Sequence, residues 1–236
     1  MSEAADSGAP VNQSIARAAR LLGLFTVEDP ELSLSQMATR LGVSRATVHR
    51  YATALRNAGL LRMTSSGYGL GPRVIELAAT AIAGLRVVSV AGPFLERLVD
   101  EANETAVLSV WDGEAPVVVR VDDNTTRTVR INVRTGARLE RDSAQGMIFR
   151  AYPPIAERKL AAVVDEGVAF SASRIEGIAA LATPVFQADR VVATLALVGT
   201  LASIDQARTS RVGAALREVG AALSGELGHV AQSDGA

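Results

Sequence analysis

The stretch from Gly42 to Leu61, GVSRATVHRYATALRNAGLL, constrains the fold of this chain more than any other. Ala38, Gly42 and Val48 stand at spacings of four and six. A helix-turn-helix has this pattern, because a small residue lets the two helices approach, a glycine makes the turn and a branched residue on the second helix is buried. Ser44 is well placed to cap the second helix with its hydroxyl. The chain is therefore predicted to contain a helix-turn-helix.

The second helix of this motif is predicted to have one buried face and one presented face. At about 100° per residue, the buried side gathers Val48, Tyr51, Ala52 and Leu55. On the presented side, arginine can bind a phosphate or a guanine edge, and small side chains let the backbone approach base edges. The candidate DNA contacts on this helix are Ser44, Arg45, Ala46, Thr47, His49 and Arg50. The alternative for each arginine is a solvated charge, and for His49 it is contact with water alone.

Helices are also predicted on the amino-terminal side of the motif. Apolar residues recur every three or four positions between Asn12 and Val27, and Asp29-Pro30 ends this amphipathic helix. Its buried stripe is expected to consist of Ile15, Ala18, Ala19, Leu22 and Phe25. A second, short helix is predicted from about Ser33 to Leu41.

A wing is predicted to follow the motif. Residues 60–64 and 68–71 have the composition of two strands, and residues 65–67 form the turn between them. Ser65 and Ser66 are candidate DNA contacts, together with Arg62 and Tyr68, although Tyr68 can equally pack under the hairpin. The predicted DNA-binding domain spans residues 11–71.

The charge of the chain is unevenly placed. The net charge is only −1, but residues 11–73 hold eight arginines and three acidic residues, a local excess of +5. A basic block of this kind is typical of phosphate binding. Taken alone it is also consistent with the ordinary fluctuation of charge along a short segment.

The rest of the chain predicts a connector helix, over residues 72–90, and an α+β domain, over residues 91–230. The connector begins at Pro72 and is mostly apolar, so we expect it to pack, with another subunit as one candidate surface. Helices are predicted from Gly92 to about Asn103, from Ser143 to Tyr152 and from about Asp205 to Leu227. The predicted strands are residues 105–111, 116–122, 126–133, 178–187 and 190–200. Helices at both ends of a mostly antiparallel sheet give this fold class.

Composition argues against several other functions. The chain has two histidines and no cysteine, and the histidines lie on the predicted DNA-reading helix and near the carboxyl end. Chemistry that uses histidine with serine or cysteine therefore has no base, and neither a metal-ligand spacing nor a phosphate-binding glycine loop is found. The longest apolar runs are shorter than the roughly 20 residues that span a bilayer, and the first ten residues lack the features of a secretion signal. We expect a cytoplasmic DNA-binding protein that is not an enzyme and has no cofactor.

The order of these elements resembles the IclR family of bacterial transcriptional regulators. The resemblance is carried by four stretches: LSLSQMATRLGVSRATVHRYATALRNAGLL with the wing SGYGLGPRVIELA, FLERLVDEANETAVLSVWDGEAPVVVRVDD, RINVRTGARLERDSAQG, and GIAALATPVFQADRVVATLALVG. Three departures stand out. Glu140-Arg141-Asp142 and Gly146-Met147 replace the usual Pro-Leu-His-like run and Gly-Lys, residues 160–170 are shortened, and Ala180, Ala196 and Val198 replace positions that are often polar.

The resemblance implies a GAF-like effector domain, with a small carboxylate or aromatic acid bound between the sheet and the helix that starts near Ser143. The positions that match the family's effector site are Thr128, Ile131, Ala144, Gln145, Ala180, Ala196 and Val198. Alternation along the strand and helical phase add Ser109, Trp111 and Arg150. Trp111 would stack on a ring or pack in the core, and Arg150 would bind the carboxylate or lie exposed. Free N–H groups of Ala144 and Gln145 at the helix start would favour an anion.

Ala180, Ala196 and Val198 make one wall of this site apolar, which favours an aromatic acid of the hydroxybenzoate type over a small polar acid; the same wall is also consistent with ordinary core. We therefore expect a dimeric or tetrameric regulator of catabolic genes that binds a roughly palindromic operator. The alternative is a DNA-binding oligomer whose carboxyl-terminal domain serves only for assembly.

Overall fold

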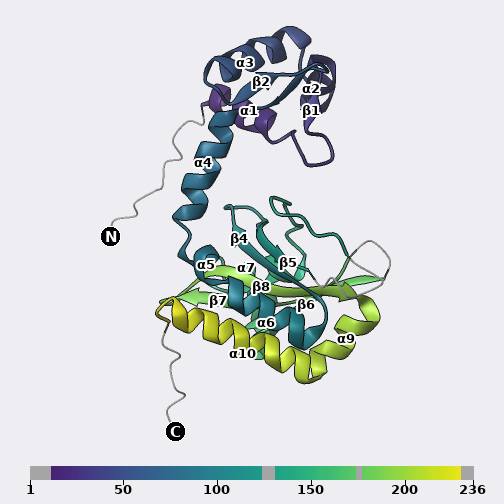
Figure 1. The fold of residues 1–236 in the computed structure, drawn as a ribbon, viewed down its shortest axis with the longest axis vertical. Helices are drawn as coiled ribbons and strands as arrows, with labels where there is room; N and C mark the ends of the chain where they lie inside the picture. The colour runs from purple at the N-terminus through teal and green to yellow at the C-terminus, as the bar shows by residue number, and fades with distance from the viewer. Residues whose placement is uncertain (1–11, 124–130, 174–176, 230–236) are drawn as a thin grey trace, which may run out of the picture. The chain divides into compact units, whose positions relative to one another are not determined.

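The computed structural model describes residues 12–123, 131–173 and 177–229, except for the side chains of residues 206–209. The chain divides into two compact units, Met1–Ala81 and Ile82–Ala236. The boundary falls inside helix α4 (Pro72–Ala83), within the predicted connector (Figure 1).

The amino-terminal unit is a winged helix-turn-helix. Before α4 its elements are α1 (Gln13–Leu22), β1 (Glu31–Leu32), α2 (Leu34–Leu41), α3 (Arg45–Asn57), β2 (Leu61–Met63) and β3 (Tyr68–Leu70). The three strands form an antiparallel sheet in the order β1-β3-β2. Ser33 and Gln36 form a capping box at the start of α2, and Gly42 ends that helix in the left-handed region with a φ of 67°. The turn between α2 and α3 therefore has the geometry that its sequence predicts.

The core of this unit confirms the predicted buried face of α3 and corrects that of α1. Val48 and Ala52 are fully buried, and Leu55 is nearly so. In α1, Leu21 is fully buried, whereas Ile15 is 68% exposed. The helix ends at Leu22, earlier than predicted, because Gly23 is a poor helix former and caps it. The buried stripe therefore passes through Leu21 and leaves the first turn outside the core.

The carboxyl-terminal unit is built on a five-stranded antiparallel sheet in the order β5-β4-β8-β7-β6. Its strands are β4 (Thr105–Trp111), β5 (Pro116–Asp122), β6 (Ala169–Ala172), β7 (Ile178–Gln187) and β8 (Arg190–Thr200). Its helices, after the end of α4, are α5 (Arg86–Val90), α6 (Gly92–Ala102), α7 (Ala144–Ala151), the 3-10 turn η1 (Arg158–Leu160), α8 (Ala161–Glu166), α9 (Leu201–Thr209) and α10 (Arg211–Glu226).

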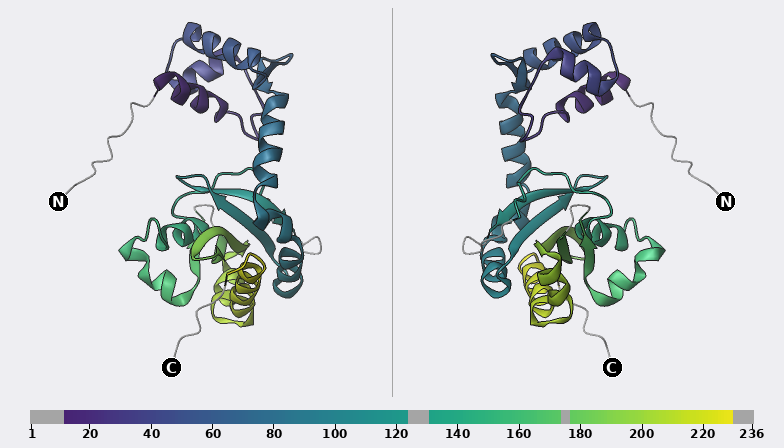
Figure 2. Two further views of the ribbon diagram at one scale, coloured as in Figure 1. Left: turned by 90° about the vertical axis from the view of Figure 1, so that its left-hand side faces the viewer. Right: turned by 90° about the vertical axis from the view of Figure 1, so that its right-hand side faces the viewer.

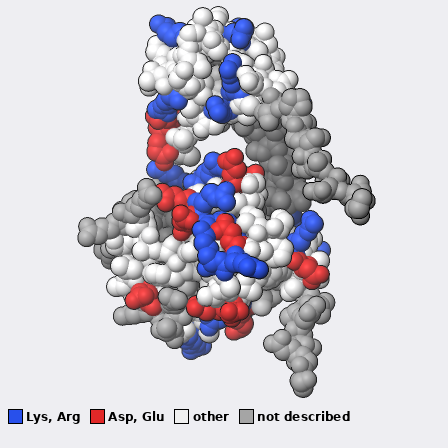
Figure 3. Space-filling view, turned by 180° about the vertical axis from the view of Figure 1, so that it is seen from behind, with Lys and Arg blue, Asp and Glu red and all other residues white. Residues whose placement is uncertain are grey.

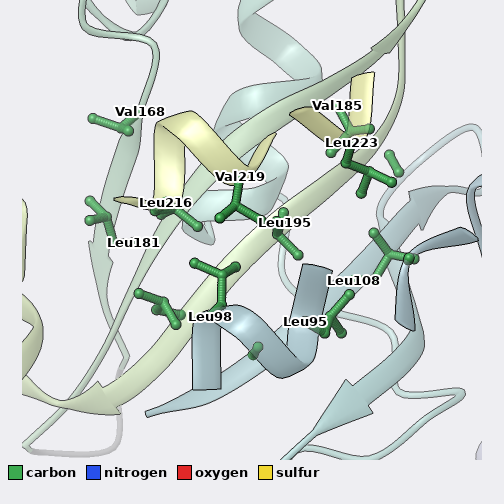
Figure 4. Close-up of a cluster of buried hydrophobic side chains, with 14 of the residues drawn as sticks. Leu95, Leu98, Leu108, Val168, Leu181, Val185, Leu195, Leu216, Val219 and Leu223 are labelled. Atoms are coloured by element: carbon green, nitrogen blue, oxygen red, sulfur yellow. The ribbon is translucent and has the colours of Figure 1, made fainter. Parts of the chain in front are cut away.

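Helices cover both faces of this sheet. Figure 2 shows α6 and α10 on one side and α7 with α8 on the other. Leucines and valines of α6 and α10 pack on alternate residues of the strands, including Leu108, Leu181 and Leu195, to make the main core (Figure 4). A smaller cluster on the opposite face joins Ala144 and Ile148 of α7 to alanines of the sheet.

Two predicted elements of this unit differ from the structure, and one observed strand had no counterpart in the prediction. The helix expected over residues 205–227 is two helices, because Ser210 caps α10 through a bond from the Val212 N–H to its hydroxyl. The strand expected over residues 126–133 lies mostly outside the described residues, and its described end, residues 131–133, is irregular. Strand β6 was not predicted; it pairs with the edge of β7.

Candidate nucleic-acid interface and effector face

The amino-terminal end of α3 presents polar and basic side chains on a capped helix. The Ser44 hydroxyl accepts the N–H of Thr47 at 3.2 Å and lies 3.0 Å from the Thr47 hydroxyl. The side chains of Arg45, Ala46, His49 and Arg50 are exposed, and that of Thr47 is half-buried. Since Val48 and Ala52 are fully buried, α3 has the buried face and the presented face that its sequence predicts.

The two arginines of this face are placed to meet an anion. Within the described part of the chain, neither Arg45 nor Arg50 forms an ion pair with an acidic residue. The Arg50 guanidinium lies 5.7 Å from the centre of the Tyr51 ring, which limits its motion. On the face seen in Figure 3, the charged side chains of the amino-terminal unit are mainly basic, whereas both signs are mixed on the carboxyl-terminal unit. The surface thus has the charge that a phosphate backbone attracts.

The wing is tied to the strand that precedes the helix-turn-helix. Ser66 donates its hydroxyl to the carboxylate of Glu31 in β1, and this bond holds the pKa of Glu31 below its ordinary value. Ser65 is exposed at the tip, and Arg62 is exposed on β2. Tyr68 is 6% exposed, so it packs under the hairpin, the second of the two roles predicted for it.

The face of the large sheet that α7 covers is built from rows of small side chains. Antiparallel register places paired residues side by side on one face. One row is Thr105, Val198, Ala180 and Ser171, and the next is Val107, Ala196, Ala182 and Ala169. Ala180 and Val198 are partly exposed, whereas Ala196 is fully buried against α7. The three predicted wall positions therefore lie on one face, and the structure brings them together.

At the start of α7, the prediction that the Ala144 N–H is free is wrong. The N–H of Ala144 donates to the hydroxyl of Ser171 at 2.8 Å, and the Ser143 hydroxyl accepts the N–H of Gly146 at 3.2 Å. The Gln145 side chain is buried and donates its amide to the Ser109 hydroxyl at 3.0 Å. The N–H groups of Ala144 and Gly146 are thus satisfied by serine hydroxyls, and Ala144 has no N–H left for an anion.

Arg150 corrects a second prediction, because its guanidinium is neither exposed nor available to a ligand carboxylate. The side chain is 5% exposed, and its Nε and Nη2 donate to the two carboxylate oxygens of Glu157 at 2.8 and 2.7 Å. Nη1 donates to the backbone oxygen of Arg141 and to the carboxylate of Asp142. Four of the five donors of the guanidinium are thus used within the domain. Its role is to join the segments before and after α7.

Trp111 lies at one edge of this face and is partly exposed. Its ring centre is 5.3 Å from that of Phe149 on α7, and the Arg141 guanidinium lies 5.8 Å from it. Of the other predicted effector positions, Ile131 is half-buried in an irregular segment and Thr128 lies outside the described residues. Thr194, next to Ser109 on the same face, was not predicted; alternation from Ala196 would have found it.

Two further observations concern the function classes that composition argues against. In the three described segments no helix is long and apolar enough to cross a membrane. The same segments contain no cluster of three or more histidine, aspartate or glutamate side chains that would hold a metal ion.

A winged helix-turn-helix with an exposed, basic reading helix defines a DNA-binding protein, and comparison with known proteins gives its family. Residues 14–64 match the IclR helix-turn-helix domain. The HTH-type transcriptional regulator Rv1719 of Mycobacterium tuberculosis is 39% identical over 109 residues, which are 45% of this chain and 41% of that protein. The HTH-type transcriptional regulator KipR of Bacillus subtilis is 25% identical over 92% of this chain and 98% of its own length.

A solved structure has the same fold over most of both chains. It is an IclR homolog of Microbacterium hydrocarbonoxydans complexed with 4-hydroxybenzoate, with a TM-score of 0.72 and 23% identity over 91% of this chain and 98% of the other. The chain is thus similar over most of its length to transcriptional regulators of the IclR type, and its residues 14–64 match the helix-turn-helix domain of that family.

Proposed function

We propose that this IclR-type regulator binds a roughly palindromic operator by docking α3 in the major groove, with the wing against the backbone. The observation that carries the proposal is the division of α3 into a fully buried face and a face that presents Arg45, His49 and Arg50. Ser44, Ala46 and Thr47 would let the backbone approach the bases, and Ser65 and Ser66 would meet phosphates. Because its partner is operator DNA, we place the protein in the cytoplasm.

Replacing Arg50 by alanine tests this assignment. A bidentate arginine–guanine contact is worth about 1–3 kcal/mol, so the variant should bind promoter DNA roughly 5- to 150-fold more weakly in a fluorescence-anisotropy titration. Arg217→Ala is the control, because Arg217 is exposed on α10, in the other unit. Equal operator affinities of wild type and Arg50→Ala, with both proteins folded, would contradict the assignment.

We further propose that a small carboxylic acid, aromatic and of the hydroxybenzoate type, binds on the α7 face and modulates operator binding, controlling catabolic genes. Support comes from the apolar side chains of Ala180 and Val198, which are partly exposed, and from the Microbacterium homolog, which holds 4-hydroxybenzoate. A thermal-shift screen of benzoate, hydroxybenzoates and phenylacetate against glyoxylate and pyruvate tests the class. A ligand at 100 times its Kd adds about 2.7 kcal/mol of stability, and stabilisation by the small polar acids alone would contradict it.

A second candidate is a domain that binds no effector and serves only for assembly. The full burial of Ala196 and Ile148 favours it, because the centre of the α7 face is then ordinary core. The same thermal-shift screen separates the two, since this candidate predicts no shift with any acid.

Self-association is proposed through α4. Ile75 is 72% exposed and Ile82 is 41% exposed, and helical phase places both on one apolar stripe with Ala78 and Ala79. A dimer or tetramer would bury this stripe and match a palindromic operator. Sedimentation equilibrium at micromolar concentration tests the proposal, and a monomer would contradict it.

A further inference from the structure

We propose that Thr194, with Ser109 and Gln145, forms a polar subsite that recognises a hydroxyl group on the ring of the effector. The inference rests on the proposed function, because it concerns the same face and the same class of acid. Its starting point is the side chain of Thr194, which is fully buried and whose hydroxyl oxygen has no hydrogen-bond partner among the described residues. Most buried hydroxyls are hydrogen-bonded, so an exception calls for an explanation.

The position of Thr194 in the sheet places its side chain on the α7 face. Thr194 in β8 is paired with Ser109 in β4, two residues from the pair of Ala196 and Val107. Ala196 packs against α7, and side chains two apart on a strand share a face. The Ser109 hydroxyl is bonded to Gln145 of α7, which independently fixes the same face. Thr194 therefore lies beside Ser109 on the face that α7 covers, and the Ser109 hydroxyl is bonded to the Gln145 amide.

The chemistry of this group suits a hydroxyl better than a carboxylate. Each hydroxyl in it can both donate and accept a hydrogen bond, and so can a phenol. A carboxylate would need a cation, and the guanidinium of Arg150, the buried cation of α7, is occupied by Glu157 and Asp142. The acid group of the effector is therefore assigned to the partly exposed side of the face, and the ring hydroxyl to the buried side.

A ligand hydroxyl would reach this subsite by displacing the Gln145 side chain. Because Thr194 and Ser109 are both fully buried, a ligand hydroxyl would reach them by taking the place of the Gln145 amide on Ser109. The neighbouring Ala182 and Ala196 are small side chains that pack in the same cluster as Ile148 of α7. Thr194 would then gain a hydrogen-bond partner, which its hydroxyl does not have among the described residues.

Thr194→Val tests the subsite, with Thr183→Val as its matched control. Valine keeps the shape of threonine and removes the hydroxyl. Thr183 is also buried, but its hydroxyl donates to the backbone oxygen of Gly167 at 2.9 Å. The melting temperature should therefore fall in Thr183→Val and stay unchanged or rise in Thr194→Val.

Calorimetric titrations of both variants and wild type with 4-hydroxybenzoate and benzoate give the second readout. In wild type, 4-hydroxybenzoate should bind more tightly than benzoate. In Thr194→Val this preference should shrink by roughly 3- to 10-fold, the worth of one neutral hydrogen bond, with benzoate affinity unchanged, whereas Thr183→Val should keep it.

Three outcomes would overturn the subsite. If both acids bind wild type and Thr194→Val keeps the preference, the subsite is wrong while the proposed effector class stands. A drop in melting temperature for Thr194→Val as large as that for Thr183→Val would show that the hydroxyl already has a structural partner. If neither acid binds wild type, the proposed aromatic effector fails and the subsite fails with it.

Discussion

At the scale of single residues, Arg150 shows how one buried cation holds the two ends of a helix. Its partners lie eight residues before it and seven residues after it, in Asp142 and Glu157. The pairing depends on the chain turning back after α7, where the N–H of Glu157 donates to the backbone oxygen of Arg150 at 2.8 Å. Helical phase alone does not reveal that turn, which is why the sequence predicted a ligand contact or an exposed side chain instead.

This network predicts an acid-dependent contribution to stability. The Arg150 guanidinium lowers the pKa of Glu157 from its ordinary 4.5 to about 2. As pH falls, the unfolded state takes up the proton first, so the stability that Glu157 contributes above pH 4.5 is lost as pH approaches 2. Glu157→Gln should therefore be less stable than wild type at pH 7, and the difference should shrink between pH 4.5 and 2.

Urea denaturation at a series of pH values measures this difference. Glu96→Gln is the control, because Glu96 is an exposed carboxylate on α6. A difference between wild type and Glu157→Gln that does not change with pH would show that the charge of Glu157 has no part in holding α7.

At the scale of elements, the packing of α10 on the sheet depends on one close approach. A Cβ at Gly220 would lie 2.6 Å from the Cγ2 of Thr183 in β7, whereas a Cβ at Gly225 in the same helix would meet nothing within 4 Å. Gly220→Ala should therefore destabilise the protein by about 1–3 kcal/mol through overpacking. Gly225→Ala should be neutral or stabilise it by roughly 0.5–1 kcal/mol, since alanine is the better helix former.

Thermal or urea unfolding of the two variants checks this pair. Because both substitutions add one methyl group to one helix, they differ only in what that group meets. Equal effects on the free energy of unfolding would mean that α10 does not pack on β7 as closely as the structure has it.

Elements fixed by local signals were predictable, and those fixed by distant contacts were not. The turn glycine, the caps and the buried face of α3 all lie within a few residues of one another, so the helix-turn-helix follows from its sequence. Strand β6 depends on β7 for its pairing, and the Ser171 hydroxyl that caps Ala144 lies 27 residues away from it. The family resemblance therefore singled out Ala180, Ala196 and Val198, which do share one face of the sheet, but it did not reveal the Ser171 hydroxyl that accepts the Ala144 N–H.

At the scale of the whole molecule, the boundary between the two units falls within a continuous helix, α4. Just after α4, Arg86 donates to the backbone oxygen of Glu226 at the end of α10, so the base of the connector is joined to the core of the carboxyl-terminal unit. A ligand changes DNA affinity only if it binds two arrangements of the protein with different affinity. In the proposed function, α4 would transmit the difference between these two arrangements from the effector-binding unit to the DNA-binding unit.

The most direct test is the affinity of wild-type protein for DNA from its own promoter, measured by fluorescence anisotropy with and without saturating 4-hydroxybenzoate. The coupling free energy between two binding sites is typically about 1–3 kcal/mol. We therefore expect 4-hydroxybenzoate to change the Kd for specific DNA by roughly 5- to 150-fold. Binding to a scrambled sequence should change much less. An acid that stabilises the protein against heat but leaves its operator affinity unchanged would contradict the claim that this regulator is controlled by its effector.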